Sequence, residues 1–274
     1  MTDYLVYDVF TDTRFGGNQL AIFPDATGLP EADLQSIARE FNFSETTFVT
    51  PDESGAHRVR IFTPTMEVPF AGHPVIGTAV ALADAGAGPE MTFALGIGEV
   101  AVRAADGAAR FVTRAALEEQ ARPDPALAAR ALGLDPGQVA GPPVMASLGL
   151  PFVFVPLTDR AALSAITTDV AAFREGAAAY PSNLDFAIYA YVDAGETIHA
   201  RMFAPLDLIP EDPATGSAAA TLAALLTRDR AAPQSLTIRQ GDDMGRPSVI
   251  AVTAEPGAVT VSGRAVRVMQ GRLV

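Results

Sequence analysis

Cysteine and lysine are both absent from this sequence of 274 residues, in which all 19 basic residues are arginine. Without cysteine the chain can form no disulfide, thiolate nucleophile or cysteine-based metal site. Without lysine it offers no Schiff base to pyridoxal phosphate and lacks the lysine of a phosphate-binding loop. The three histidines, His57, His73 and His199, are not clustered at ligand spacing, so we expect no metal centre. Acid and base chemistry is then left to carboxylates, tyrosines and a few imidazoles.

Positive charge and long hydrophobic runs are also scarce. The formal net charge is −13 and the pI is near 4.6, whereas a nucleic acid or an anionic membrane requires a basic face as its partner. No apolar stretch approaches the roughly 20 residues that cross a bilayer, and the first residues do not read as a secretory leader. We therefore expect a cytoplasmic protein that binds a small molecule and has no nucleic-acid or membrane partner.

A repeated motif is the most informative feature that the sequence does contain. Residues 60–64 read Arg-Ile-Phe-Thr-Pro, and residues 201–205 read Arg-Met-Phe-Ala-Pro. Each copy leads into a polar loop, residues 70–74 and 211–217, and then into a helix of small residues. Two copies of one strand-loop-helix unit predict a pseudo-twofold protein with its ligand between the halves.

The hydrophobic pattern predicts an α+β fold with many strands and few long helices. The polar, proline-bearing stretch 120–125 is the candidate boundary between a first lobe, 1–120, and a second lobe, 121–274. A return of the final strand to the first lobe is left open. Expected strands span 4–10, 20–23, 46–50, 57–63, 98–103, 110–114, 152–156, 186–192 and 197–203, and expected helices lie around 34–41, 74–85, 126–132 and 213–227.

Glu45 is the candidate general acid and base. A solvated loop carboxylate is the ordinary interpretation of such a residue. Two observations favour a functional one: its apolar neighbours, and a repeat register that places Phe186 of the second half opposite it. A carboxyl group that is partly removed from water has a raised pKa and can exchange a proton near neutral pH.

The two polar loops carry the other candidates. Gly72 and His73 begin a predicted helix, where free amides attract a carboxylate or enolate; His73 either packs against this helix or orients the substrate and relays a proton. Asp212 precedes Pro213 as an expected N-cap, a role compatible with a place in the site. The amides around Gly216 and Ser217 suit a polar ligand.

Five ordered motifs resemble the PhzF phenazine-biosynthesis family over almost the whole chain. This family is similar in fold to diaminopimelate epimerase, in which each of two lobes wraps a mostly antiparallel, barrel-like sheet around a central helix. The site lies between the lobes. The motifs are Phe15-Gly16-Gly17-Asn18, residues 43–48, residues 62–74, residues 212–217, and Gln240-Gly241 with residues 244–247.

The resemblance implies Glu45 as the general acid and base, with His73, Asp212, Ser217 and the Gly72 backbone placing the substrate. It further implies a homodimer and proton transfer on trans-2,3-dihydro-3-hydroxyanthranilate without cofactor or metal. The epimerase relatives use two cysteines, whose matching places here look like Ala71 and Thr215, so a two-thiol mechanism is excluded. A racemase or isomerase acting on another small acid, or a non-catalytic metabolite-binding protein, remains an alternative.

Overall fold

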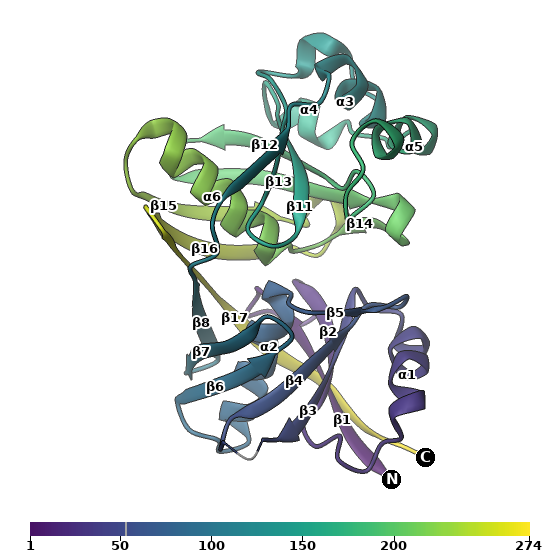
Figure 1. Ribbon diagram of the computed structural model, residues 1–274, viewed down its shortest axis with the longest axis vertical. Helices are drawn as coiled ribbons and strands as arrows, with labels where there is room; N and C mark the ends of the chain where they lie inside the picture. The colour runs from purple at the N-terminus through teal and green to yellow at the C-terminus, as the bar shows by residue number, and fades with distance from the viewer. Residues whose placement is uncertain (53) are drawn as a thin grey trace. The chain divides into compact units, whose positions relative to one another are not determined.

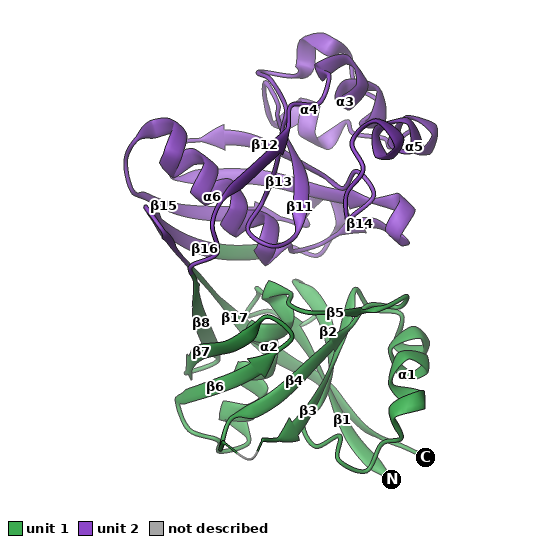
Figure 2. Cartoon of the chain, in the orientation of Figure 1, with its two compact units in different colours: residues 1–113, 248–250, 260–274 green, residues 114–247, 251–259 purple. Residues whose placement is uncertain are grey.

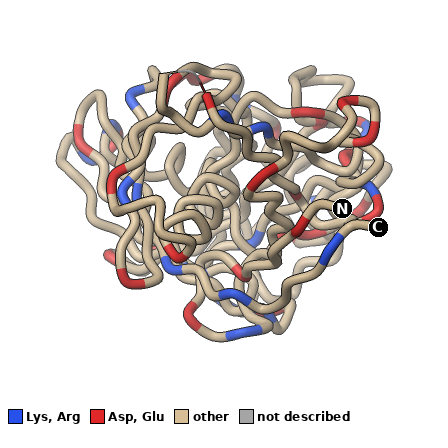
Figure 3. Tube along the Cα trace, turned by 90° about the horizontal axis from the view of Figure 1, so that it is seen from below, with Lys and Arg blue, Asp and Glu red and all other residues tan. Residues whose placement is uncertain are grey.

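The computed structural model describes residues 1–52 and 54–274, which form two compact units (Figure 2). The first unit contains residues 1–113, 248–250 and 260–274, and the second contains residues 114–247 and 251–259. Acidic and arginine residues are scattered along the whole trace rather than gathered in one segment (Figure 3). Within the described part of the chain, no helix is both long and apolar enough to span a membrane.

The first unit is built on a mixed sheet (Figure 1). Strand β2 runs antiparallel to β1 and parallel to β3, β4 is antiparallel to β3, and β6 runs parallel to β4. The hairpin pairings β6–β7 and β7–β8 complete the order. The strands are β1 (Thr2–Val9), β2 (Asn18–Phe23), β3 (Glu45–Pro51), β4 (His57–Phe62), β5 (Glu67–Val68), β6 (Glu90–Leu95), β7 (Gly98–Ala105) and β8 (Ala108–Thr113).

Helix α2 (Gly72–Asp84) is the central helix of this unit and packs against β1, β2, β3, β7 and β8. Its small and apolar residues are buried from Gly72 to Leu82, as expected for a helix that a sheet surrounds on all sides. A Cβ atom on Gly77 would lie 2.6 Å from the side chains of both Leu20 and Val9, so this close packing requires glycine. The shorter helix α1 (Leu34–Phe41) instead buries one face against an aromatic cluster that includes Phe23 and Phe48.

The second unit repeats the same order of strand pairings. Strand β11 is parallel to β12, β12 is antiparallel to β13, and β15 runs parallel to β13. Two α-helices lie between β11 and α6, where the first unit has a single α-helix, α1, between β2 and α2. The elements are β9 (Glu118–Ala121), α3 (Pro125–Ala131), β10 (Val144–Ser147), β11 (Pro151–Pro156), α4 (Arg160–Ser164), α5 (Val170–Ala179), β12 (Ile188–Ala194), β13 (Thr197–Ala204), β14 (Ile209–Asp212), α6 (Gly216–Arg230) and β15 (Gln234–Gln240). Two further strands, β16 (Ser248–Glu255) and β17 (Ala258–Leu273), are shared by the two units, and most of β17 belongs to the first. The predicted α+β class, with a sheet around a central helix in each half, is confirmed.

The division of the chain differs from the one expected after residue 120. The first unit ends at Thr113, because Glu118–Ala121 forms β9, which pairs with β10 of the second unit. The polar, proline-bearing stretch therefore lies within the second unit, where it leads from the end of β9 to the start of α3, rather than forming a linker. At the other end of the chain, β17 pairs antiparallel with β1, from Thr2 opposite Leu273 to Val9 opposite Ala265, and so returns to the first unit.

The strand register also corrects the expected counterpart of Glu45. Thr46 pairs with Phe62, whereas Ile188 pairs with Phe203, so the ladder places Ala187, and not Phe186, at the position equivalent to Glu45. Phe186 precedes β12 in a left-handed conformation with φ of 59°. Its buried ring packs so closely on α5 that a Cβ atom on Gly176 would lie 2.3 Å from it. The sequence alignment by constant offset missed this one-residue irregularity.

Candidate functional site

Glu45 lies at the start of β3, beside the N-terminal end of α2. Its side chain is only 15% exposed, and its Oε2 atom is 3.3 Å from Nδ1 of His73. Side chains two residues apart on a strand share one face. Thr47, on the same face of β3, meets Thr78 of α2 with a distance of 3.0 Å between the hydroxyl oxygens. The face of β3 that contacts α2 therefore places the Glu45 carboxylate beside the N-terminal end of this helix.

His73 is the second residue of α2 and its imidazole is buried. Burial lowers the pKa of His73 to about 3, against a smaller opposite effect from a hydrogen bond with the Gln19 backbone. The imidazole is therefore neutral at neutral pH, with one nitrogen protonated. Because Nδ1 faces Glu45, a hydrogen bond between them needs one proton: on Nδ1 when Glu45 is ionised, or on Glu45 when it is not.

Asn18 is a member of this group that sequence reasoning did not single out. It begins β2 and is buried, with Nδ2 3.4 Å from Nδ1 of His73, while its Oδ1 atom accepts a hydrogen bond from Ser44 Oγ at 3.4 Å. The loop before it is tightly constrained, since a Cβ atom on Gly17, which has φ of 62°, would lie 2.3 Å from the Val9 carbonyl oxygen. The sequence signal that could have identified Asn18 is the motif Phe15-Gly16-Gly17-Asn18, which ends in this residue.

The N-terminal end of α2 offers main-chain donors to the same place. Ala71 is the N-cap residue in an extended conformation, and no side chain caps this end within the described residues. The first amides of an α-helix have no partner within the helix and carry a partial positive charge. Glu45, His73 and the Gly72 backbone thus form one group in the first unit.

Asp212 is the last residue of β14 in the second unit and is buried. Thr215 Oγ1 donates a hydrogen bond to Asp212 Oδ2 at 2.5 Å. Helix α6 begins at Gly216 with Thr215 as its N-cap residue, so both the expected helix start at Pro213 and the expected N-cap role of Asp212 are wrong. The reason is that Asp212 pairs with Met202 of β13, which keeps the chain extended at this point.

Gly216 and Ser217 form the first turn of α6. Gly216 is buried, and Ser217 is partly exposed while its carbonyl oxygen accepts a hydrogen bond from Thr221 Oγ1 at 3.0 Å. As in α2, no side chain caps the helix among the residues described. Asp212, Gly216 and Ser217 are therefore close neighbours in the second unit. That they share one site with the Glu45 group stays a prediction.

An arginine clamp precedes the helix in each unit. Arg201 of β13 binds Glu211 through two hydrogen bonds of 2.8 Å, and also donates to the Leu163 carbonyl oxygen at 2.9 Å. Arg60 of β4 binds Glu67 in the same two-pronged way at 2.8 and 2.6 Å. Each guanidinium group is therefore paired with a carboxylate of the chain itself. In the second unit this carboxylate belongs to Glu211, the residue directly before Asp212.

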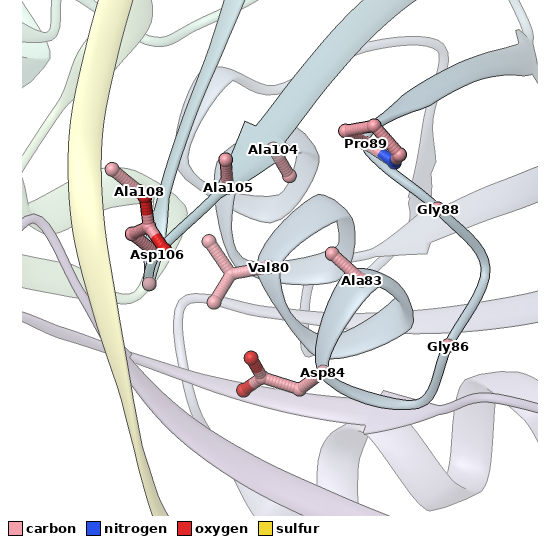
Figure 4. Close-up of a pocket in the computed structure, with 11 residues that line it drawn as sticks. Val80, Ala83, Asp84, Gly86, Gly88, Pro89, Ala104, Ala105, Asp106 and Ala108 are labelled. Carbon is pink, nitrogen blue, oxygen red and sulfur yellow. The ribbon is translucent and has the colours of Figure 1, made fainter.

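One surface hollow of the first unit lies away from the Glu45 group. Figure 4 shows this hollow of about 340 Å³, which is lined by Val80, Ala83, Asp84 and the turn around Asp106. It sits at the C-terminal end of α2, opposite to the end that carries His73, where the helix dipole disfavours an anion. Asp84 there accepts a hydrogen bond from the buried Tyr7 hydroxyl at 2.8 Å. Among the described residues no three His, Asp or Glu side chains are grouped as a metal site.

Comparison with known proteins defines the class. Residues 7–271 match the family model of the phenazine biosynthesis-like proteins, PhzC-PhzF. An uncharacterized isomerase of Mesorhizobium japonicum is 40% identical, over 99% of this chain and 98% of its own. The trans-2,3-dihydro-3-hydroxyanthranilate isomerase of Pseudomonas aeruginosa is 38% identical, over 99% of both chains. The solved structure of a predicted epimerase from Pseudomonas aeruginosa superposes with a TM-score of 0.84 at 31% identity, covering 100% of this chain and 99% of that one.

The protein is therefore an isomerase with an epimerase-like α+β fold. More specifically, the chain belongs to the PhzC-PhzF family, as its five motifs predicted.

Proposed function

We propose that the chain catalyses a proton shift on a small cyclic carboxylic acid without cofactor or metal, and that this acid is trans-2,3-dihydro-3-hydroxyanthranilate or a close analogue. One observation carries the proposal: the largely buried Glu45 carboxyl group lies 3.3 Å from a buried neutral imidazole at a helix N-terminus. Two further points support the substrate class: the name of the 38% identical relative, and the absence of any thiol.

The proposed chemistry uses Glu45 twice. Ionised Glu45 removes a proton from a ring carbon, and the electron pair of that C–H bond moves into the conjugated ring system. The protonated carboxyl group then returns the proton to another ring carbon. The product is an enol, which tautomerises to a ketone. Atoms and charge balance within the substrate and Glu45, so no redox partner is needed. A positioned general base of this kind typically contributes a rate factor of about 10²–10⁴.

The neighbouring groups bind the substrate and accommodate both protonation states of Glu45. The amides at the α2 N-terminus suit the substrate carboxylate. His73, neutral at working pH, either donates to ionised Glu45 from Nδ1 or accepts from protonated Glu45, so it accommodates both stages of the proton transfer. Asp212 and the first turn of α6 complete the proposed substrate contacts.

Deuterium incorporation tests this proposal directly. The purified protein is incubated in heavy water with trans-2,3-dihydro-3-hydroxyanthranilate, and product and ring-carbon deuterium are followed by nuclear magnetic resonance and mass spectrometry. We expect isomerisation, with deuterium at the receiving carbon to the extent that the proton on Glu45 exchanges with solvent before its return, and loss of isomerisation in Glu45→Gln. Tight binding with neither isomerisation nor exchange would identify a binding protein, and reaction of another small acid only would identify a different isomerase or racemase.

The cytoplasmic location and the homodimer belong to the same proposal. They are supported by the acidic composition and by the family resemblance read from the sequence. Size-exclusion chromatography with light scattering tests the dimer, and a mass equal to that of one chain of 28.5 kDa would contradict it.

A further inference from the structure

The side-chain amide of Gln240 makes four hydrogen bonds within the second unit. Gln240 is the last residue of β15, and its side chain is 1% exposed. Nε2 donates to the Asp212 carbonyl oxygen at 2.7 Å and to Thr215 Oγ1 at 2.9 Å. Oε1 accepts from the Thr215 amide and from the Tyr189 hydroxyl, each at 3.2 Å. Two donors and two lone pairs are the full capacity of this group, so all of it is used.

The main chain fixes the orientation of this amide. The Thr215 N–H can only donate and the Asp212 C=O can only accept, and both face the Gln240 side chain. Rotating the amide by half a turn would set donor against donor and acceptor against acceptor in a buried place, where each unsatisfied group costs about 1–3 kcal/mol. The amide therefore has one stable orientation.

That orientation decides where the Thr215 hydroxyl hydrogen points. Thr215 Oγ1 already accepts from Gln240 Nε2, and its own hydrogen is donated to Asp212 Oδ2, with 2.5 Å between the two oxygen atoms. The bonds form one directed series: Tyr189 hydroxyl to Gln240, Gln240 to Thr215, and Thr215 to Asp212. Its final step delivers a hydrogen bond to a fixed oxygen of the Asp212 carboxylate.

Gly241 keeps the Gln240 end of the strand against this loop. Its φ is +77°, and a Cβ atom there would lie 2.7 Å from the Pro213 carbonyl oxygen and 2.3 Å from that of Arg246. Only glycine allows the backbone to approach so closely. The Gln240-Gly241 motif, which the proposed reaction leaves unexplained, thus has a physical purpose.

We propose that Gln240 is a positioning residue, which acts through Thr215 to fix the orientation and hydrogen bonding of the Asp212 carboxylate toward the substrate. This inference rests on the proposed function, since it assigns Asp212 a contact with the ligand. The threonine that stands where epimerase relatives are expected to carry a cysteine is, in this chain, the intermediate that connects Gln240 to Asp212.

Four variants test the series. Gln240→Met keeps the volume but removes all four bonds, and Thr215→Val removes only the hydroxyl. Thr215→Ser restores the hydroxyl, and Tyr189→Phe is the matched control, because it removes one buried bond to Gln240 without touching the Thr215–Asp212 link. Each variant is first checked for folding by circular dichroism and thermal unfolding. Where Gln240→Met does not fold, Thr215→Val breaks the same series with less disturbance.

The measurements are kcat/KM for trans-2,3-dihydro-3-hydroxyanthranilate and calorimetric affinity for 3-hydroxyanthranilate, its aromatic counterpart. We expect Gln240→Met and Thr215→Val to lose about 10- to 100-fold in kcat/KM, since misplacement of a contact group by an ångström has effects of that size. Thr215→Ser and Tyr189→Phe should stay near the wild type. The double variant Gln240→Met/Thr215→Val should be no worse than the poorer single variant, because both act through one link.

Each outcome is decisive. If the folded Gln240→Met and Thr215→Val proteins retain wild-type kcat/KM, or if their losses multiply in the double variant, Gln240 is not a positioning residue although the proposed function stands. If the wild type binds 3-hydroxyanthranilate but turns nothing over, the proposed function fails, and the same order of variants in affinity then supports or overturns the inference. A wild type that neither binds nor turns over the acids overturns both.

Discussion

The two units use one architecture to hold two different polar groups. In each unit, an arginine-glutamate clamp joins the two strands that precede the N-terminus of a buried helix. In the first unit the side chains at that helix end are a carboxyl group and an imidazole, Glu45 and His73. In the second they are a carboxylate, a hydroxyl and an amide, Asp212, Thr215 and Gln240. The shared backbone therefore supplies amides and position, and the side chains supply the difference in chemistry.

The difference lies in how firmly the direction of the hydrogen bonds beside each carboxyl group is fixed. The second-unit series has a single direction that backbone groups enforce. In the first unit, Glu45 Oε2 lies 3.3 Å from His73 Nδ1, and a hydrogen bond between them could run in either direction, depending on which group holds the proton. A group that must gain and lose a proton needs such an adaptable partner, whereas a group that only holds a substrate is better served by a fixed one. The comparison thus favours Glu45 as the proton carrier.

Substitution of the two carboxyl groups is the strongest test of this comparison. We expect Glu45→Gln to lower kcat by about 10²–10⁴-fold, because the amide keeps the shape but accepts no proton. Asp212→Asn should reduce kcat less and raise KM, since it alters a contact rather than the base. Steady-state kinetics with both variants checks this, with thermal unfolding as the control for folding. Equal losses in kcat would contradict the division of roles.

The clamps should differ in their contribution to stability. The Arg201 and Glu211 side chains are 10% and 17% exposed, whereas those of Arg60 and Glu67 are 22% and 42% exposed. Loss of one partner from a buried ion pair costs about 3–5 kcal/mol, and an exposed pair contributes about 1 kcal/mol or less. Arg201→Ala should therefore lower the free energy of unfolding much more than Arg60→Ala, as urea denaturation would show. The reverse order would mean that solvent reaches the Arg201 clamp.

The central helices differ in how closely the sheet packs on them. Gly77 and Thr221 are each the sixth residue of their helix. The second unit accommodates a threonine side chain at this position, whereas a Cβ atom on Gly77 would lie 2.6 Å from side chains of β1 and β2. Gly77→Ala should destabilise the fold by about 1–3 kcal/mol through overpacking, despite its higher helix propensity. Thr221→Ala loses one hydrogen bond, to the Ser217 carbonyl oxygen, worth about 1 kcal/mol. Denaturant midpoints of the two variants compare these effects, and a stabilised Gly77→Ala would show that β1 and β2 yield easily.

The pH dependence of stability tests whether the buried His73 imidazole stays neutral in the folded protein. Burial lowers the pKa of His73 from 6.5 to about 3, so the unfolded chain binds a proton that the folded chain does not. Stability that is fully present above pH 6.5 is therefore lost as the pH falls, by up to about 1.4 kcal/mol per pH unit. Unfolding measured between pH 6.5 and 5 should show a weaker slope in His73→Gln than in the wild type. Equal slopes would mean that the imidazole is protonated in the folded state.

Much of the architecture was accessible from pattern alone. Alternation, apolar runs and glycine or proline punctuation predicted β4, β7, β11 and β13 closely. Part of β7 alternates between exposed and buried residues, whereas β11 is an almost continuous buried run. The repeat predicted two similar units, and the motifs predicted the family. The start of α6 was missed because Pro213 suits the first turn of a helix, yet β-pairing with Met202 keeps Asp212 extended.

Local sequence determined which residues could carry chemistry here: the lack of thiols and lysines left carboxylates, and two loops placed them next to helix starts. Tertiary structure decided who their partners are. Asn18 meets His73 from β2, and Gln240 reaches Asp212 from the end of β15. Such pairings depend on strand order and register, which arise from burying a whole sheet around a helix and leave no trace in nearby sequence. The same long-range packing makes Ala187, rather than Phe186, the counterpart of Glu45 in the second unit. It also pairs β17 with β1 of the first unit.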